Sequence, residues 1–295
     1  MKILAPAKIN LSLDIVGRRP DGYHTLNMVM QSISLCDVVS AERTREESVE
    51  LSCSEKDVPC DSGNTVLRAA DAFFAAAEVP VRHGGLRFRV EKRIPRQAGL
   101  GGGSADAAAA LKLLNRMYRA GLTAEQIRKI GLSIGADVPF CVEGGTASVQ
   151  GIGEIVKPVA PMMMCNIVVC RPHIGISTKD AYAEFDQKGV LPSEGHSAEV
   201  LYALETGRLD QLGKSLGNAF EAVGAPKEIS DIEEEMFRYG SLGACMTGSG
   251  SAVFGLFDRA EEAVACRAHL LEQYSAVFLC HPVSRIRRSE SVPED

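Results

Sequence analysis

The sequence lacks the cysteine patterns of a metal site. Its nine cysteines are scattered through 295 residues, and they form no Cys-x-x-Cys pair and no Cys/His grouping with zinc spacing. Several lie in apolar runs, as Cys165 and Cys170 do within residues 162–170. We therefore expect the thiols to pack as small buried hydrophobic groups in a reducing compartment.

The sequence also lacks long apolar stretches and an excess of positive charge. No run reaches the roughly 20 apolar residues that a membrane-spanning helix requires, and residues 1–8 lack the apolar core of a signal peptide. The net charge is -6, whereas a nucleic-acid partner normally requires a basic face. The composition, 45% hydrophobic and 24% charged, is that of an ordinary globular protein. These features predict a cytoplasmic protein without a membrane or nucleic-acid partner, and they leave its oligomeric state open.

Two common phosphate-binding motifs are absent as well. A Walker-type loop needs a lysine directly after its last glycine, and here Gly103 is followed by Ser104. The dinucleotide pattern Gly-x-Gly-x-x-Gly fails because Ser104 and Asp106 stand where its third glycine is needed. The sequence therefore gives no support to a nicotinamide-dependent oxidoreductase.

A different glycine-rich loop is present, and it runs from Pro95 directly into an alanine-rich helix. Four of its residues have no Cβ, which lets backbone N–H groups approach a ligand closely: Gly99, Gly101, Gly102 and Gly103. The start of the helix adds unpaired N–H groups and the positive end of a dipole, and both attract phosphate. The loop predicts an anion-binding site, with a plain turn that caps a buried helix as the alternative.

Hydrophobic periodicity along the chain predicts an α+β fold. The first half combines strands at 9–15, 28–39 and 86–94 with a turn at 19–22, helices at 65–77, from 105 onward and at 124–133, and a loop at 135–140. The second half combines strands at 162–170 and 276–282 with helices at 198–204, 209–217, 227–239 and 260–273, and a glycine-rich loop at 246–254. We expect two lobes, residues 1–157 and 158–295, without tandem repeats.

Five ordered motifs carry a family resemblance: PAKIN at 6–10, RRPDGYHTL at 18–26, GLGGGSADAA at 99–108, GADVPF at 135–140 and MTGSG at 246–250. Together they resemble the GHMP kinase superfamily over nearly the whole chain. Within it they are similar to kinases that phosphorylate the 2-hydroxyl of a cytidine diphosphate-linked methylerythritol, in the non-mevalonate route to isoprenoid precursors. The resemblance implies a two-lobed fold with the active site between the lobes, and it implies ATP as co-substrate.

The resemblance also implies a role for each matching residue. Asp137 is the candidate general base and Lys8 its cationic partner. ATP contacts are implied for Asn64, Pro95, Arg96, Gln97, Ala98, Gly99, Leu100, Gly101, Gly102, Gly103, Ser104 and Ala105, with Mg²⁺ near Ser104. Substrate contacts are implied for Asn10, Tyr23, His24, Thr178, Tyr182, Thr247 and Gly248, with Tyr23 and His24 matching the pair that binds cytidine.

Other interpretations of these residues stay open at this point. Taken alone, Asp137 is a turn aspartate, Lys8 is an exposed lysine at a strand start, and Asn64 is a helix N-cap. The loop also departs from many superfamily members, which have glycines where Gln97 and Ala98 stand. The rival functions are a GHMP kinase for homoserine or a mevalonate-type alcohol, and a catalytically silent ligand sensor.

Overall fold

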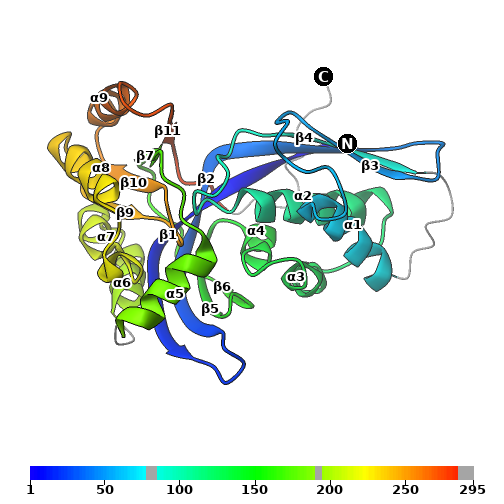
Figure 1. The fold of residues 1–295 in the computed structure, drawn as a ribbon, viewed down its shortest axis with the longest axis horizontal. Coiled ribbons are helices and arrows are strands. Elements are labelled where there is room, and N and C mark those ends of the chain that lie inside the picture. The colour runs from blue at the N-terminus through cyan, green and yellow to red at the C-terminus, as the bar shows by residue number, and fades with distance from the viewer. Residues whose placement is uncertain (78–84, 190–194, 285–295) are drawn as a thin grey trace.

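Two long antiparallel strands run through the centre of the fold (Figure 1). The computed structural model describes residues 1–77, 85–189 and 195–284. In it β1 (Lys2–Arg18) pairs with β2 (His24–Arg43), and the predicted turn connects them. Gly22 has φ +88 in this turn, a left-handed conformation that glycine adopts without a steric penalty.

Strand β1 is buried on both faces, although its alternating pattern predicted a half-buried strand. The apolar positions, Ile9 among them, are buried as expected. The polar positions are buried too, because helix α6 (His196–Thr206) packs against the strand. Ser12 Oγ, for example, lies 2.9 Å from Ser197 Oγ. Ser12 and Asp14 therefore face α6 rather than solvent.

The first sheet has seven strands, with β3-β4-β2-β1-β8 in order; β5 pairs with β2, and β6 pairs with β5. Its further strands are β3 (Val49–Cys53), β4 (Leu86–Glu91), β5 (Thr146–Gly151), β6 (Ile155–Pro158) and β8 (Gly217–Asn218). Strand β4 was predicted, although it ends at Glu91 rather than at Ile94, whereas β3, β5, β6 and β8 were not predicted. Since β8 pairs in parallel with β1, the second half of the chain contributes a strand to the sheet of the first half.

Four helices accompany this sheet: α1 (Thr65–Ala76), α2 (Gly102–Met117), α3 (Ala124–Leu132) and α4 (Val138–Glu143). The predicted start of α1 is confirmed, because Asn64 Oδ1 accepts a hydrogen bond from Val66 N at 2.9 Å. The predicted capping box between Thr123 and Gln126 opens α3. Local capping chemistry thus fixes both helix starts.

Two predicted boundaries in this region were wrong. Helix α2 begins at Gly102 rather than near residue 105, directly after Gly101, whose φ is +67. Residues 138–140 form the start of α4 instead of a loop. Pro139 lies in the first turn of α4, where its missing N–H removes no hydrogen bond of the helix. Both changes bring a helix start to the same region of the molecule.

The second half of the chain builds a four-stranded sheet in the order β11-β7-β10-β9, with helices beside it (Figure 1). Its strands are β7 (Asn166–Arg171), β9 (Gly243–Met246), β10 (Val253–Phe257) and β11 (Ala276–Cys280). Besides α6, its helices are α5 (Thr178–Lys188), α7 (Leu209–Ser215), α8 (Lys227–Arg238), α9 (Ala260–Leu270) and the 3₁₀ turn η1 (Glu221–Val223). The α+β class is confirmed, whereas β9 and α5 were missed and the strand predicted from residue 162 begins only at Asn166.

Most cysteines pack as predicted. Six are buried with free thiols: Cys141, Cys165, Cys170, Cys245, Cys266 and Cys280. Cys36 and Cys53 are half-buried, and Cys60 is exposed, so the expectation was wrong for Cys60. None of the helices in the described ranges has the length and hydrophobicity of a membrane span.

Candidate active site

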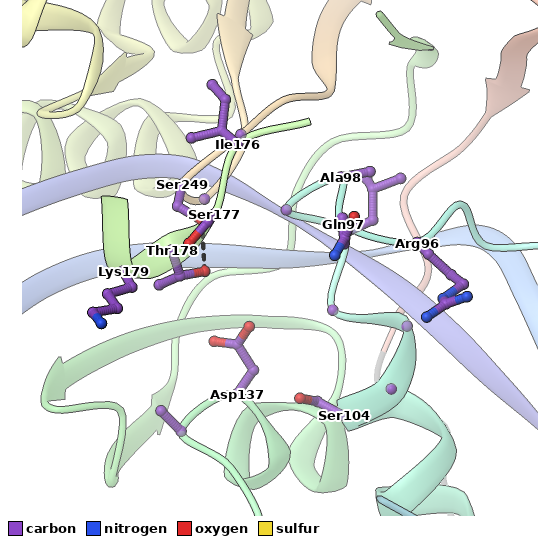
Figure 2. A pocket seen from close by; sticks show the side chains of 18 of the residues that line it. Arg96, Gln97, Ala98, Ser104, Asp137, Ile176, Ser177, Thr178, Lys179 and Ser249 are labelled. Atoms are coloured by element: carbon purple, nitrogen blue, oxygen red, sulfur yellow. Dashed lines mark hydrogen bonds between the residues drawn. The ribbon is translucent and has the colours of Figure 1, made fainter. Parts of the chain in front are cut away.

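A cleft of about 1480 Å³ brings most of the predicted site residues together. Its walls come from β1, the turn after β1, the glycine-rich loop, the start of α4, the start of α5 and the loop between β9 and β10. All predicted residues line the cleft except Ala105 and Thr247, which are buried beneath its surface. Figure 2 shows Asp137 and Ser104 on one side, and Thr178 and Ser249 on the other.

Lys8 is a buried cation on the floor of this cleft. Its side chain is 4% exposed, and Nζ donates a 2.7 Å hydrogen bond to Asn10 Oδ1. Lys8 and Asn10 lie two residues apart on β1, so their side chains share one face of the strand. A Cβ built on Gly101 would lie 2.9 Å from Lys8 Cγ, so this glycine allows the loop to rest on the lysine stem. The exposed lysine expected from the residue alone is therefore not what the structure has.

Asp137 lies beside this lysine at the start of α4. Its Oδ2 is 3.6 Å from Lys8 Nζ, and its side chain is 35% exposed. Although Asp137 occupies the N-cap position, its side chain forms no capping hydrogen bond. The carboxylate is thus directed to the cleft and the lysine, which is not the behaviour of an ordinary turn aspartate.

The glycine-rich loop lies directly over the loop between β9 and β10. Gly99 has φ +71, and a Cβ built on it would lie 2.0 Å from Thr247 O, so only glycine fits there. Thr247 Oγ1 in turn accepts a 3.0 Å hydrogen bond from Asn10 N. Gln97 has φ +51, a left-handed conformation that L side chains rarely adopt. Gln97 therefore adopts the backbone conformation that a glycine would adopt at this position, but its side chain makes that conformation sterically unfavourable.

The side of the cleft next to α1 is held by polar contacts. Asn64 uses both ends of its amide, with Oδ1 capping α1 and Nδ2 donating to Pro59 O at 2.7 Å. Thr65 Oγ1 donates to Gly103 O at 2.8 Å, which connects α1 to the first turn of α2. Arg96 donates to Asp57 O at 2.7 Å. The expected N-cap role of Asn64 is real, and the residue lines the cleft at the same time.

An aromatic wall closes the opposite end. His24 stacks on Tyr182 with ring centroids 4.7 Å apart and an interplanar angle of 18°. His24 Nε2 lies 2.8 Å from Asp186 Oδ1, which fixes the imidazole orientation. Burial, together with the Asp137 carboxylate, raises the pKa of Tyr182 to about 12, so the phenol stays neutral. Tyr23, in contrast, is 62% exposed and extends into the opening.

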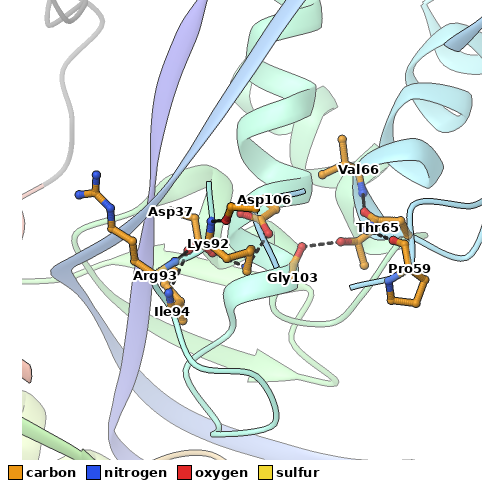
Figure 3. A network of polar contacts seen from close by, with 11 residues as sticks. Asp37, Pro59, Thr65, Val66, Lys92, Arg93, Ile94, Gly103 and Asp106 are labelled. Carbon is orange, nitrogen blue, oxygen red and sulfur yellow. Dashed lines mark hydrogen bonds and ion pairs between the residues drawn. The ribbon is translucent and has the colours of Figure 1, made fainter. Parts of the chain in front are cut away.

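A buried charge cluster under the glycine-rich loop was missed by sequence reasoning. Figure 3 shows Lys92 between Asp37 and Asp106, with its Nζ donating to Asp106 Oδ2 at 2.7 Å and forming an ion pair with Asp37. Burial raises the pKa of Asp106 to about 7, against the lowering effect of Lys92. A Cβ on Gly102 would lie 3.3 Å from Lys92 Nζ. The cluster therefore supports the loop from below.

These groups are suited to phosphoryl transfer. That reaction requires positioned phosphates, neutralisation of their charge and a group that accepts the hydroxyl proton. The glycine-rich start of α2 presents backbone N–H groups, Lys8 supplies a buried positive charge, and Asp137 supplies a carboxylate beside it. Groups suited to all three requirements thus lie within one cleft.

Comparison with known proteins agrees with this chemistry. Residues 64–145 match the GHMP kinase N-terminal domain and residues 200–276 match the GHMP kinase C-terminal domain. A 4-diphosphocytidyl-2-C-methyl-D-erythritol kinase of Clostridium botulinum (strain Eklund 17B / Type B) is 40% identical over 96% of this chain and 100% of its own. The same-named kinase of Carboxydothermus hydrogenoformans is 43% identical over 89% of this chain and 90% of its own. The chain therefore belongs to the 4-diphosphocytidyl-2-C-methyl-D-erythritol kinase family of the GHMP kinases.

Solved structures agree at two levels. The crystal structure of a 4-(cytidine 5'-diphospho)-2C-methyl-D-erythritol kinase superposes with a TM-score of 0.79 at 32% identity, covering 96% of this chain and 99% of that chain. A homoserine kinase from Cytophaga hutchinsonii gives a TM-score of 0.73 at 18% identity, covering 97% of this chain and 95% of that chain. The second similarity shows the shared fold alone. The chain is thus an ATP-dependent phosphotransferase with an alcohol acceptor.

Proposed function

We propose that this kinase transfers the γ-phosphoryl group of ATP to the 2-hydroxyl of 4-diphosphocytidyl-2-C-methyl-D-erythritol. The observation that carries the mechanism is the pair formed by Lys8 and Asp137, with 3.6 Å between Nζ and Oδ2, in the cleft below the glycine-rich loop. Relatives that align over nearly their full length are named as kinases of this acceptor, which supports the same acceptor for this chain.

In the proposed mechanism Asp137 accepts the proton of the acceptor hydroxyl as its oxygen bonds to phosphorus. Its partial exposure leaves carboxylate lone pairs accessible from the cleft, which a general base requires. Lys8 holds a positive charge close to the reacting oxygens and offsets the charge that develops there. Asn10 fixes the direction of the ammonium group through its 2.7 Å hydrogen bond.

ATP binds with its phosphates at the N-terminus of α2 in this proposal. The residues 95–104 surround the phosphates, and Asn64 lies on the side where the adenine would be placed. The described residues contain no group of three His, Cys, Asp or Glu side chains that could hold a metal. The Ser104 hydroxyl is the protein group proposed to hold Mg²⁺, which would neutralise phosphate charge when bound with ATP.

The cytidine is proposed to bind at the aromatic wall. His24, fixed by Asp186, can present its ring to the pyrimidine, and Tyr23 can close over the base from its exposed position. Thr178 and Gly248 line the path from this wall to Asp137, where the diphosphate would lie. Thr247 supports Asn10 from behind and contacts the acceptor only through it.

An ADP-release assay with an acceptor panel tests the proposal. The panel holds the cytidylated substrate, the same polyol without cytidine, homoserine and mevalonate, each with ATP and Mg²⁺. We expect turnover with the cytidylated acceptor alone, and Tyr23→Ala should raise its KM while the KM for ATP stays unchanged. Turnover with homoserine or mevalonate would overturn the acceptor, and nucleotide binding without turnover would indicate a ligand sensor.

Two further expectations accompany this proposal. Residues 1–157 and 158–295 are proposed as the two lobes, with the reaction taking place between them. The cytoplasmic location, the reducing environment of the thiols and the absence of a nucleic-acid partner stay predictions from the sequence.

A further inference from the structure

Asn218 is buried outside the cleft, yet its amide controls the backbone that supports the reactive groups. The residue is 5% exposed and belongs to β8, which pairs with β1 at Leu13. Its Nδ2 donates two hydrogen bonds of 2.8 Å, one to Met246 O and one to Gly248 O. Both N–H bonds of the amide are therefore used on carbonyls that flank Thr247.

The oxygen of this amide also forms a hydrogen bond. Asn218 Oδ1 accepts a 3.0 Å hydrogen bond from Phe220 N. Next to it, Glu221 Oε1 accepts a 2.7 Å hydrogen bond from Met246 N. The segment from Met246 to Gly248 is thus fixed on both its carbonyl and its N–H side by one short stretch of chain.

This segment touches Asn10, the glycine-rich loop and Lys8. Thr247 Oγ1 accepts from Asn10 N at 3.0 Å and lies 3.3 Å from Asn10 Oδ1, the same oxygen that binds Lys8. The Thr247 carbonyl lies against Gly99 in the glycine-rich loop. A Cβ on Gly248 would lie 3.2 Å from Lys8 Nζ, so the ammonium rests on this glycine.

We propose that Asn218 is a positioning residue for phosphoryl transfer, acting through Thr247 and Asn10 on the Lys8 ammonium. This inference rests on the proposed role of Lys8. Loss of the amide would remove a donor from two carbonyls, leaving the Met246 carbonyl with only the weak Cys245 thiol donor at 3.4 Å, and the segment would move to restore the lost hydrogen bonds. A displacement of about 1 Å at a reacting group is enough to slow a reaction on the order of 100-fold.

The test uses Asn218→Asp and Asn218→Ala, with Asn115→Ala as the matched control. Asn115 also bridges backbone with its amide, through two 3.0 Å hydrogen bonds to Leu122, but it does not line the cleft. We expect the Asn218 variants to lose about 100-fold in kcat while both KM values change less than about threefold. The control should lose a similar amount of thermal stability with kcat within about twofold of wild type.

A double variant separates positioning from general loosening of the fold. Thr247→Val keeps the shape of the side chain and removes the hydroxyl that binds Asn10. If Asn218 acts through Thr247, Asn218→Ala adds little further loss of kcat in the Thr247→Val background. Multiplied losses in the double variant, or a kcat near wild type in folded Asn218→Asp, would overturn the inference.

The Asn218 variants could fail to fold, and the proposed acceptor could be incorrect; each case gives a different experimental result. If both Asn218 variants lose their native circular dichroism spectrum, Asn218→Ser keeps one donor and should show an intermediate loss of kcat; a kcat like that of wild type would contradict the inference. The kcat of each variant is compared with the kcat of wild type, using whichever acceptor the wild-type enzyme turns over. An incorrect acceptor therefore fails in the wild-type assay, whereas an incorrect role of Asn218 fails only in the variants.

Discussion

Lys8 Nζ lies 2.7 Å from Asn10 Oδ1 but 3.6 Å from Asp137 Oδ2. The first distance is that of a hydrogen bond, whereas the second is an ion pair without a short contact. Lys8 therefore stabilises the charge of Asp137 electrostatically and leaves the lone pairs of the carboxylate free for a hydroxyl group. This division of contacts is what a general base beside a cation requires.

Asp137→Asn should lower kcat by about 10²- to 10⁴-fold, because an amide cannot accept the hydroxyl proton. The KM for ATP should change little, and so should the melting temperature, since the Asp137 side chain caps nothing. Steady-state ADP release and a thermal melt check both parts. Thr123→Ala is the opposite control: it removes a capping box, lowers stability by about 1 kcal/mol and leaves kcat unchanged.

Lys8→Arg should be nearly as harmful to kcat as Lys8→Met, although it keeps the charge. The lysine stem packs closely against Gly101 and its ammonium against Gly248, and a planar guanidinium has another shape and other donor directions than an ammonium. We expect both variants to lose at least about 100-fold in kcat, the range for removal of a positioned charge from an active site. Substantial activity of Lys8→Arg would mean that charge alone is sufficient.

Two glycine substitutions in one loop should have opposite effects. Gly99→Ala places a Cβ 2.0 Å from Thr247 O at positive φ, and should lower the free energy of unfolding by about 2–4 kcal/mol. Gly103→Ala meets only Thr65, at 3.5 Å, in the first turn of α2, and should add up to about 1 kcal/mol of stability. Urea denaturation measures both, and any rise in the ATP KM of Gly103→Ala reports phosphate contact at that turn.

Asp186→Ala should raise the KM of the cytidylated acceptor by about tenfold, because His24 loses the hydrogen bond that orients its ring. The KM for ATP and the kcat at saturating acceptor should stay near wild type. Asp210→Ala is a suitable control, since Asp210 forms an ion pair with the exposed Arg208 and does not line the cleft. An effect of Asp186→Ala confined to ATP would contradict the proposed cytidine site.

Glu233 should make the protein less stable as pH rises. Burial, together with a hydrogen bond with Glu221, raises the pKa of Glu233 from its ordinary value of 4.5 to about 9. The folded state then binds more protons than the unfolded chain between these values, so stability falls with increasing pH in that window. Glu233→Gln should flatten the decline in melting temperature between pH 5 and about 8.5. The exposed neighbour Glu234, changed to Gln, should leave the slope unchanged; equal slopes for Glu233→Gln and wild type would contradict the prediction.

Local signals in the sequence were sufficient for some parts of the structure. Asn64 and Thr123 each start a helix through hydrogen bonds within three residues, so their pattern is complete in the sequence itself. Helix α4 was missed because glycine and proline in residues 135–140 are typical of loops. What makes it a helix is the burial of Val138 and Phe140, which depends on the tertiary structure.

Long-range polar contacts could not be predicted in the same way. Asp37, Lys92 and Asp106 come from three separate elements, and no spacing connects them. The family resemblance named Lys8 and Asp137, but the burial of Lys8 and its bond to Asn10 follow only from packing around β1. The contact between His24 and Asp186 likewise joins residues 162 positions apart.

The hydrogen bond between Asn10 and Thr247 joins positions that are 237 residues apart. During synthesis on the ribosome β1 therefore emerges long before the residue that anchors it, and its contacts with β8 also wait for the second half of the chain. Such distant pairing slows folding and leaves strand edges exposed to other chains in the meantime. A chain truncated before Thr247 would retain Lys8, Asp137 and the glycine-rich loop in its sequence, and we expect it to be an aggregation-prone fragment without kinase activity.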